Sequence, residues 1–320
     1  MRIAVLASGE FAVPTLQSLQ HTKREIVCVI TQPPRPAGRG RKSQLTPIGA
    51  YASEQAMDVW ALADVNGHEI VTRLRELKID LGVVIAFGQK LGPELIGAFR
   101  GGCVNLHASL LPRYRGAAPI QWAILRGEER TGVTVFRLTQ RMDAGPILTT
   151  RSTLIKPEET AEELHDRLAR IGPDAVKAAL VLFEDDPDPA GTVQDDADAT
   201  KAPKLAKKDG KLSFAQPAEQ LARQVRGLWS WPGATAVYGA ADGGRQERVT
   251  LVRARVAETA EPETVEPGFL GTGLHVATSD GWLEILEIRP QSGRVLSWPD
   301  FVNGRHTRPG DRFTPCGTGL

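Results

Sequence analysis

The chain has 320 residues, of which 41% are hydrophobic and 24% are charged, and its formal net charge at pH 7 is +1. This composition is typical of a soluble globular protein that is long enough for two domains. So small a net charge excludes attraction of a polyanion by the charge of the whole protein, so any polyanion-binding site must be a local group of basic residues. Cys28, Cys103 and Cys316 lie far apart without a CxxC spacing, which indicates buried, reduced thiols in a cytoplasmic protein rather than a disulfide framework or a zinc site.

Residues 1 to about 187 alternate short apolar segments with helical ones. Residues 2–7 are apolar but too few for a signal peptide or a membrane span, so we expect a core strand and no membrane partner. Similar apolar runs predict buried strands at residues 25–31, 80–86, 103–107 and 132–138. Helical periodicity predicts helices at residues 14–19, 46–57, 67–77, 119–126 and 160–183, the last opened by a capping box from Thr160 to Glu163. The alternation predicts a Rossmann-like, doubly wound α/β catalytic domain over residues 1–187.

A change of composition marks the end of this domain. Residues 188–206 begin with acidic residues, Pro and Gly and end with lysines, and we expect them to be a charged, solvated linker. Beyond it, the pattern predicts one helix at residues 217–228 and short strands at 234–238, 249–256, 274–278 and 282–288. Asp280-Gly281 between the last two strands is a strong hairpin signal. Residues 207–320 are therefore predicted to form a smaller, OB-like β-barrel.

The common cofactor motifs are absent. The first strand is followed by Ala7-Ser8-Gly9-Glu10-Phe11, with one glycine where a dinucleotide fingerprint needs three, and there is no GxxxxGK[ST] sequence. A GxSxG elbow is also absent, and the six histidines lack metal-ligand spacing. We therefore expect neither NAD, ATP, a nucleophilic serine nor a metal.

The candidate chemistry lies at the end of the fourth predicted strand. Because side chains alternate along a strand, Asn105 and His107 share one face, and a loop rich in Gly and Pro follows them. Asp143 lies in a turn directly after the next predicted strand. We expect the three side chains to converge, since ligands bind at the carboxyl ends of the strands of an open α/β sheet. Singly, His107 has a structural explanation as a core histidine, and Asp143 as a turn former.

The residues around this site carry a resemblance to a known family. Residues 105–121, NLHASLLPRYRGAAPIQ, together with Asp143-Ala144-Gly145, resemble the core of the formyltetrahydrofolate-dependent formyltransferases. Residues 31–40, TQPPRPAGRG, are similar to a tRNA-contacting insertion of that family, and KLAK at 204–207 and WPGA at 231–234 are similar to its linker and second domain. The departures are small: Ala108 stands where Gly is common, and Tyr114 and Phe214 stand where Trp is common.

The resemblance implies an enzyme that transfers a one-carbon group. The formyl group of 10-formyltetrahydrofolate would pass to the α-amino group of initiator methionyl-tRNA, for translation initiation, and tetrahydrofolate would be released. Asn105 and His107 would stabilise the oxyanion of the tetrahedral intermediate, and Asp143 would accept the proton of the amine. The folate pterin would lie in a cleft formed by Phe87, Gly88, Ser109, Leu110, Leu111 and Pro112.

Local basic residues are the candidate contacts to tRNA. Arg39, Arg41 and Lys42 lie in the Gly- and Pro-rich insertion, without an acidic neighbour. Lys204 at the end of the linker and Lys207 and Lys208 directly after it are further candidates, and the resemblance assigns tRNA binding to the barrel as well. A merely solvated loop and linker are the alternative interpretation of these charges. We expect a monomer.

Two other functions stay open at this point. One is a formyltransferase acting on a small amine or a nucleotide-linked aminosugar. The basic insertion that carries Arg39, Arg41 and Lys42 is the feature that discriminates between this function and transfer to tRNA. The other is a catalytically silent RNA-binding module, against which the intact Asn105, His107 and Asp143 argue.

Overall fold

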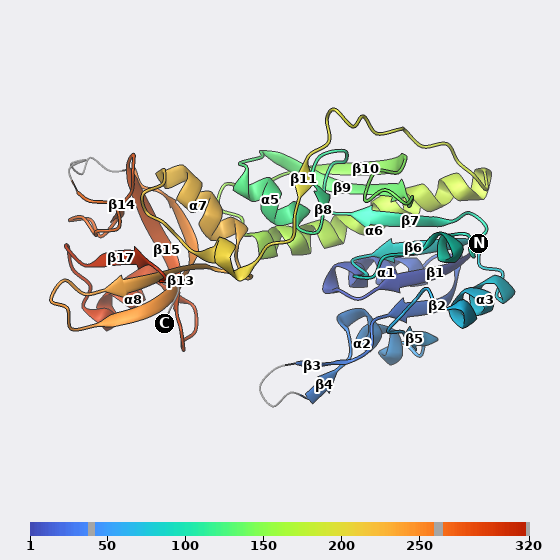
Figure 1. The fold of residues 1–320 in the computed structure, drawn as a ribbon, viewed down its shortest axis with the longest axis horizontal. Helices are drawn as coiled ribbons and strands as arrows, with labels where there is room; N and C mark the ends of the chain where they lie inside the picture. Colours follow the sequence, from blue (N-terminus) through green and yellow to red (C-terminus); the bar gives the residue numbers. More distant parts are fainter. Residues whose placement is uncertain (38–41, 259–264, 318–320) are drawn as a thin grey trace. The chain divides into compact units, whose positions relative to one another are not determined.

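The chain folds into two compact units in a computed structural model that describes residues 1–37, 42–258 and 265–317 (Figure 1). Unit 1 comprises Met1–Pro119, Arg130–Thr153 and His165–Ala202. Unit 2 comprises Ile120–Glu129, Leu154–Leu164 and Pro203–Leu320. Unit 2 is therefore not only the C-terminal part of the chain, because it includes two short segments that interrupt unit 1 in the sequence.

Unit 1 is built on a seven-stranded sheet in the order β10-β9-β7-β6-β1-β2-β5. Its strands are β1 (Arg2–Ala7), β2 (Glu25–Thr31), β5 (Val59–Ala61), β6 (Leu81–Ile85), β7 (Cys103–His107), β9 (Arg130–Arg137) and β10 (Ile147–Leu154). The four pairings from β5 to β7 are parallel, whereas β9 pairs antiparallel with β7. Two small ribbons lie outside this sheet, β3 (Arg35–Ala37) with β4 (Lys42–Gln44) and β8 (Arg115–Gly116) with β11 (Lys201–Ala202).

Helices cover this sheet, and their ends follow local sequence signals. They are η1 (Glu10–Ala12), α1 (Val13–Gln20), α2 (Pro47–Glu54), α3 (His68–Glu76), α4 (Pro93–Ile96) and α6 (Ala161–Asp185), whereas α5 (Pro119–Leu125) belongs to unit 2 from Ile120 onward. At the start of α6, the Thr160 backbone N–H donates to the Glu163 carboxylate at 2.9 Å, and the Glu163 N–H donates to Thr160 Oγ1 at 3.3 Å, which confirms the predicted capping box. α6 packs on the sheet beside β7, where a Cβ on Gly172 would lie 2.7 Å from the Leu106 side chain.

Unit 2 contains an antiparallel sheet in the order β14-β15-β13-β12-β17, with β16 paired to β15. The strands are β12 (Ala234–Gly239), β13 (Gln246–Val256), β14 (Val276–Ala277), β15 (Trp282–Pro290), β16 (Leu296–Ser297) and β17 (Arg312–Pro315), with η2 (Lys207–Gly210), α7 (Ala218–Gly227) and α8 (Trp298–Arg305). Bridges from Phe269 to Arg312 and from Leu270 to Val276 connect the two edge strands, so the sheet nearly closes around a core that includes Tyr238, Phe301 and Phe313. The predicted fold class, a Rossmann-like sheet followed by a smaller barrel, is confirmed.

Part of the segment that we expect to be a solvated linker makes defined contacts within unit 1. Asp188 pairs with Arg137, and Asp196 pairs with both Arg115 and Arg141. Lys201 and Ala202 form β11. The acidic residues have no base near them in the sequence because their partners come from segments 51 to 81 residues away.

Candidate active site

Strand β7 positions the first two candidate catalytic residues. It lies between β6 and β9, and Leu106 packs towards α6, so the side chains of Asn105 and His107 lie on the opposite face of the sheet. Asn105 is partly exposed, whereas only 7% of His107 is exposed. An amide that can meet a substrate thus lies two residues from a nearly buried imidazole.

The protonation of the His107 ring follows from its contacts. His107 Nε2 lies 2.9 Å from the Tyr114 carbonyl oxygen, which can only accept, so Nε2 carries a proton. His107 Nδ1 lies 3.8 Å from Asp143 Oδ2, which also accepts a hydrogen bond from the Gly116 N–H at 2.8 Å. Nδ1 is therefore the ring atom left to act on a substrate, and it donates only when both nitrogens are protonated. The carboxylate of Asp143 is the adjacent counter-charge for that cation.

Asp143 approaches His107 by a different route from the expected one. We expect both residues to follow carboxyl ends of strands that point the same way, but β9 is antiparallel to β7, and Arg137 near its end lies opposite Val104. The loop between β9 and β10 returns Asp143 along β7 towards His107. Asp143 has a φ of 50°, a left-handed conformation that is uncommon outside Gly, and a Cβ on Gly145 would lie 1.8 Å from the Arg137 carbonyl oxygen. The loop is thus tightly constrained.

The predicted folate-binding residues lie in the loops that follow two adjacent parallel strands. Phe87 and Gly88 follow β6, and residues 109–112 follow β7, whose Asn105 is paired with Val84 of β6. Most of these side chains point into the protein, since Phe87, Ser109 and Leu111 are at most 6% exposed. Gly88, with a φ of 79°, is exposed, whereas the carbonyl oxygens of Phe87 and Ser109 and the Leu111 N–H are hydrogen-bonded to side chains of the protein.

Three polar residues that sequence reasoning missed hold these loops in place. Thr134, which is fully buried in β9, bonds Ser109 and Leu111, and Gln194 bonds the loop that carries Asp143. Thr200 accepts a hydrogen bond from the Tyr114 N–H at 2.8 Å. No motif marks these residues, because each acts on a segment 23 to 86 residues away.

Comparison with known proteins identifies the family. Residues 1–180 match the Formyl transferase family, and residues 204–306 match the Formyl transferase, C-terminal domain family. The methionyl-tRNA formyltransferase of Cereibacter sphaeroides strain ATCC 17029 is 38% identical over 98% of this chain and 99% of its own length. The chain belongs to the methionyl-tRNA formyltransferase family. Another member, from Halorhodospira halophila, is 40% identical over 97% of this chain and 98% of its own length.

Solved structures of other formyltransferases share the fold. The N-formyltransferase from Helicobacter canadensis, solved with folinic acid and dTDP-3-aminofucose, aligns with a TM-score of 0.62 over 91% of this chain and 98% of its own length, at 17% identity. A likeness at this identity supports the two-unit fold alone. In the described residues, no cluster of three or more His, Cys, Asp or Glu side chains could hold a metal, and no helix is long and apolar enough to cross a membrane.

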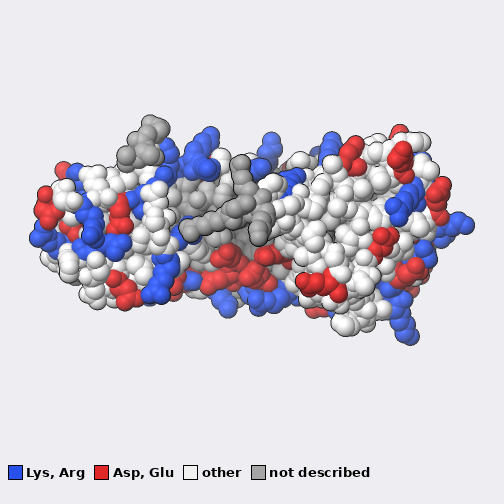
Figure 2. Space-filling view, turned by 90° about the horizontal axis from the view of Figure 1, so that it is seen from below, with Lys and Arg blue, Asp and Glu red and all other residues white. Residues whose placement is uncertain are grey.

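The predicted tRNA-binding residues are only partly described. Arg39 and Arg41 lie outside the described residues, and of Lys42 only the backbone is described. Lys204, Lys207 and Lys208 are exposed on unit 2. Figure 2 shows both basic and acidic side chains on the visible face, and the formal charges of the whole chain sum to +1. The three cysteines are buried and free, as expected, and burial raises the pKa of Cys28 to about 12.

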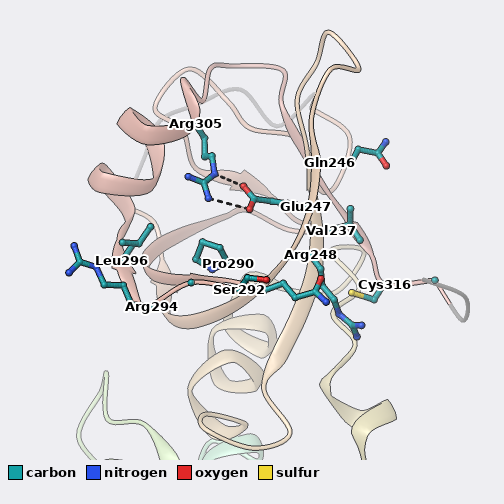
Figure 3. A pocket seen from close by; sticks show the side chains of 13 residues that line it. Val237, Gln246, Glu247, Arg248, Pro290, Ser292, Arg294, Leu296, Arg305 and Cys316 are labelled. Carbon is teal, nitrogen blue, oxygen red and sulfur yellow. Dashed lines mark hydrogen bonds and ion pairs between the residues drawn. The ribbon is translucent and has the colours of Figure 1, made fainter. Parts of the chain in front are cut away.

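Unit 2 carries a cleft of about 760 Å³ that is formed by its own residues alone (Figure 3). It lies beside β13, the turn after β15, β16 and the segment at Cys316 and Gly317. Arg248 and Arg294 are exposed at its surface, whereas Arg305 pairs with Glu247. The cleft therefore has a net positive lining.

Proposed function

We propose that this chain transfers the formyl group of 10-formyltetrahydrofolate to the α-amino group of methionyl-tRNA, producing the formylated initiator for translation. The observation that carries the proposal is the group of Asn105, His107 and Asp143, with His107 Nδ1 at 3.8 Å from the Asp143 carboxylate. Relatives named for this activity that align over nearly the whole chain support the acceptor.

The chemistry requires stabilisation of a developing oxyanion. Attack of the amine on the formyl carbon gives a tetrahedral intermediate, and a fixed hydrogen-bond donor at its oxygen is worth about 3–4 kcal/mol. The Asn105 amide is such a donor, and so is His107 Nδ1–H when the ring is doubly protonated beside the Asp143 carboxylate. The amine must also lose a proton, and Asp143 accepts it directly or through one water molecule. The proton then leaves with the folate nitrogen, which restores the carboxylate.

The loops after β6 and β7 are the proposed donor site. Because the side chains of Phe87, Ser109 and Leu111 are buried, the pterin would be recognised by backbone N–H and C=O groups and by the partly exposed Leu110 and Pro112. The fixed backbone of these loops makes such recognition specific.

The tRNA would be held by basic residues outside the catalytic group. Arg39, Arg41 and Lys42 are proposed for the end of the acceptor arm, and Lys204, Lys207 and Lys208 for phosphates elsewhere. The positive cleft of unit 2, with Arg248 and Arg294, supports a further contact to the RNA backbone. We propose that the enzyme acts as a monomer in the cytoplasm, where its free thiols stay reduced.

A formyl-transfer assay tests the proposal. The purified chain is given 10-formyltetrahydrofolate with charged initiator tRNA, with free methionine, or with a nucleotide-linked aminosugar. We expect transfer to methionyl-tRNA to be at least about a hundredfold faster than transfer to either small acceptor, because only the tRNA can contact the proposed basic residues. Faster transfer to the aminosugar would replace the proposed acceptor.

Substitutions in the catalytic group test the mechanism. We expect Asn105→Ala, His107→Ala and Asp143→Asn each to lower kcat by about two orders of magnitude with little change of KM, because these groups act mainly in the transition state. Asp185→Asn, an exposed carboxylate at the end of α6 in the same unit, is the matched control. Near wild-type kcat in any of the first three variants would remove that residue from the mechanism.

A further inference from the structure

The segment at residues 194–200 contacts both halves of the catalytic group, although nothing in its sequence indicates a role in catalysis. It lies within the acidic stretch that precedes β11. It contacts the loop that carries Asp143 and the backbone that holds His107. Both contacts lie within unit 1.

Gln194 holds the Asp143 loop. Its side-chain Nε2 donates to the carbonyl oxygens of Asp143 at 2.9 Å and of Gly145 at 2.8 Å. Its Oε1 accepts from Arg115 Nε at 3.0 Å and Nη2 at 2.8 Å. Since Gln194 is 8% exposed, this amide is nearly buried and fully hydrogen-bonded, and its donors fix the two carbonyl groups on either side of Ala144.

The two hydrogen bonds from Gln194 affect the position of Asp143 because the loop conformation is strained. Asp143 has a φ of 50°, and such a conformation persists only where the surroundings determine it. Arg141, at the start of the same loop, bonds Asp196 at 2.6 Å, and Asp196 also bonds Arg115 at 2.9 Å. The hydrogen bonds from Arg141 and then Arg115 lower the pKa of Asp196, and this carboxylate connects Arg141 of the loop to Arg115, which also bonds Gln194.

Thr200 holds the acceptor of His107. Its Oγ1 accepts from the Tyr114 N–H at 2.8 Å, and its carbonyl oxygen accepts from the Arg115 N–H at 2.8 Å. The Tyr114 carbonyl oxygen in turn accepts from His107 Nε2. Tyr114 has a φ of 63°, so this backbone is also in an uncommon conformation that needs support.

We infer that Gln194 and Thr200 are positioning residues for formyl transfer: Gln194 sets the place of the Asp143 carboxylate, and Thr200 sets the orientation of the His107 ring through Tyr114. Neither residue touches a reacting atom. Their effect belongs in kcat, because a small displacement of an oxyanion donor or a proton acceptor weakens mainly the transition state. The inference rests on the proposed function for its kinetic test.

Near-isosteric substitutions separate positioning from folding. Gln194→Glu keeps the acceptor for Arg115 but removes both donors to the loop carbonyls, and Thr200→Val removes the acceptor for the Tyr114 N–H. Thr200→Ser keeps that acceptor and should restore the function. Val193→Ala is the matched control, because Val193 is adjacent to Gln194 and its side chain is 81% exposed.

The kinetic test compares kcat with KM for both substrates. We expect Gln194→Glu and Thr200→Val to lower kcat about 10- to 100-fold with each KM close to wild type, and to remain folded at the assay temperature although the unpaired backbone groups lower the melting temperature by a few degrees. Thr200→Ser and Val193→Ala should stay within about threefold of wild type, because each retains every hydrogen bond described above. Unchanged kcat in folded Gln194→Glu and Thr200→Val, or an equal loss in Thr200→Ser and Thr200→Val, would overturn the inference.

A measurement without substrates keeps the inference separate from the proposed acceptor. The imidazole ¹⁵N resonances of His107 are assigned with His107→Asn and compared among the variants. They should shift in Thr200→Val and Gln194→Glu and stay unchanged in Thr200→Ser and Val193→Ala. Absence of formyl transfer by the wild-type chain would refute the proposed function, whereas unchanged His107 resonances in Thr200→Val would refute the positioning role of Thr200.

Discussion

Replacement of Thr134 by Val should destabilise the loop after β7, which is part of the proposed folate site. Thr134 lies in β9 and is fully buried. Its hydroxyl donates to the Ser109 carbonyl oxygen at 2.6 Å and accepts from the Leu111 N–H at 3.1 Å. One side chain therefore satisfies two backbone groups of the loop after β7.

The size of the effect follows from these two bonds. Val has nearly the same shape as Thr, so the cavity term is small, but the carbonyl of Ser109 and the amide of Leu111 lose their partner. A buried polar group left unpaired costs about 1–3 kcal/mol. Since the loop can relax and recover part of this cost, we expect Thr134→Val to lower the free energy of unfolding by about 3 kcal/mol. Thr134→Ser keeps the hydroxyl and loses one methyl group, which should cost about 1 kcal/mol.

Urea unfolding followed by far-UV circular dichroism measures this difference, and hydrogen exchange at the Leu111 amide locates it. Tetrahydrofolate affinity should fall in Thr134→Val and not in Thr134→Ser, because the backbone of residues 109–112 is the proposed recognition surface. If Thr134→Val unfolds within about 0.5 kcal/mol of Thr134→Ser, the hydroxyl does not hold the loop and the reasoning is wrong.

Two further predictions concern charge. Burial raises the pKa of Glu163, but hydrogen bonds from Arg253 and Thr160 outweigh this effect and lower the pKa overall. The ionised Glu163 therefore stabilises the fold at pH values above its unfolded pKa, and this stabilisation is lost as the pH falls through the folded pKa. Glu163→Gln should therefore cost about 1 kcal/mol at pH 7 and less below about pH 4, measured by unfolding at both pH values, and an equal cost at both would contradict the assignment. The affinity for tRNA should fall with salt, with a log-log slope of about 0.7–0.9 for each phosphate contact. Combined alanine substitution of Lys204, Lys207 and Lys208 should reduce that slope by about two to three without changing folate affinity. An unchanged slope would exclude these three lysines from RNA binding.

The sequence determined the features that depend on neighbouring residues. The alternation in β7 correctly predicts that Asn105 and His107 share a face, and the capping box correctly predicts the start of α6. Apolar runs predict the buried strands of unit 1, and turn signals such as Asp280-Gly281 predict the antiparallel pairing of β14 with β15. These patterns are readable because backbone periodicity and turn conformation are set within a few residues.

Elements with weaker local patterns were not predicted. β5 has only three residues, and every residue of β10, with the sequence ILTTRSTL, is partly or fully exposed, so neither shows the apolar run of a buried strand. α8 begins at Trp298 after an N-cap serine, Ser297, yet it has only eight residues and a short apolar pattern. In such segments, pairing and packing with distant parts of the chain decide the structure more than local preference does.

Only the tertiary structure decided how the catalytic group is held. Asp143 reaches His107 although β9 runs antiparallel to β7, and the acidic stretch finds its bases at Arg115, Arg137 and Arg141. Gln194 contacts residues 49 and 51 positions earlier in the chain, and Thr200 contacts a residue 86 positions earlier. Hydrogen bonds and ion pairs depend on direction and on distances of a few ångströms, which arise only when long-range packing has brought the segments together. The hydrophobic effect has no direction and scales with the apolar area that is buried, so the pattern of apolar residues is enough to indicate which segments are buried.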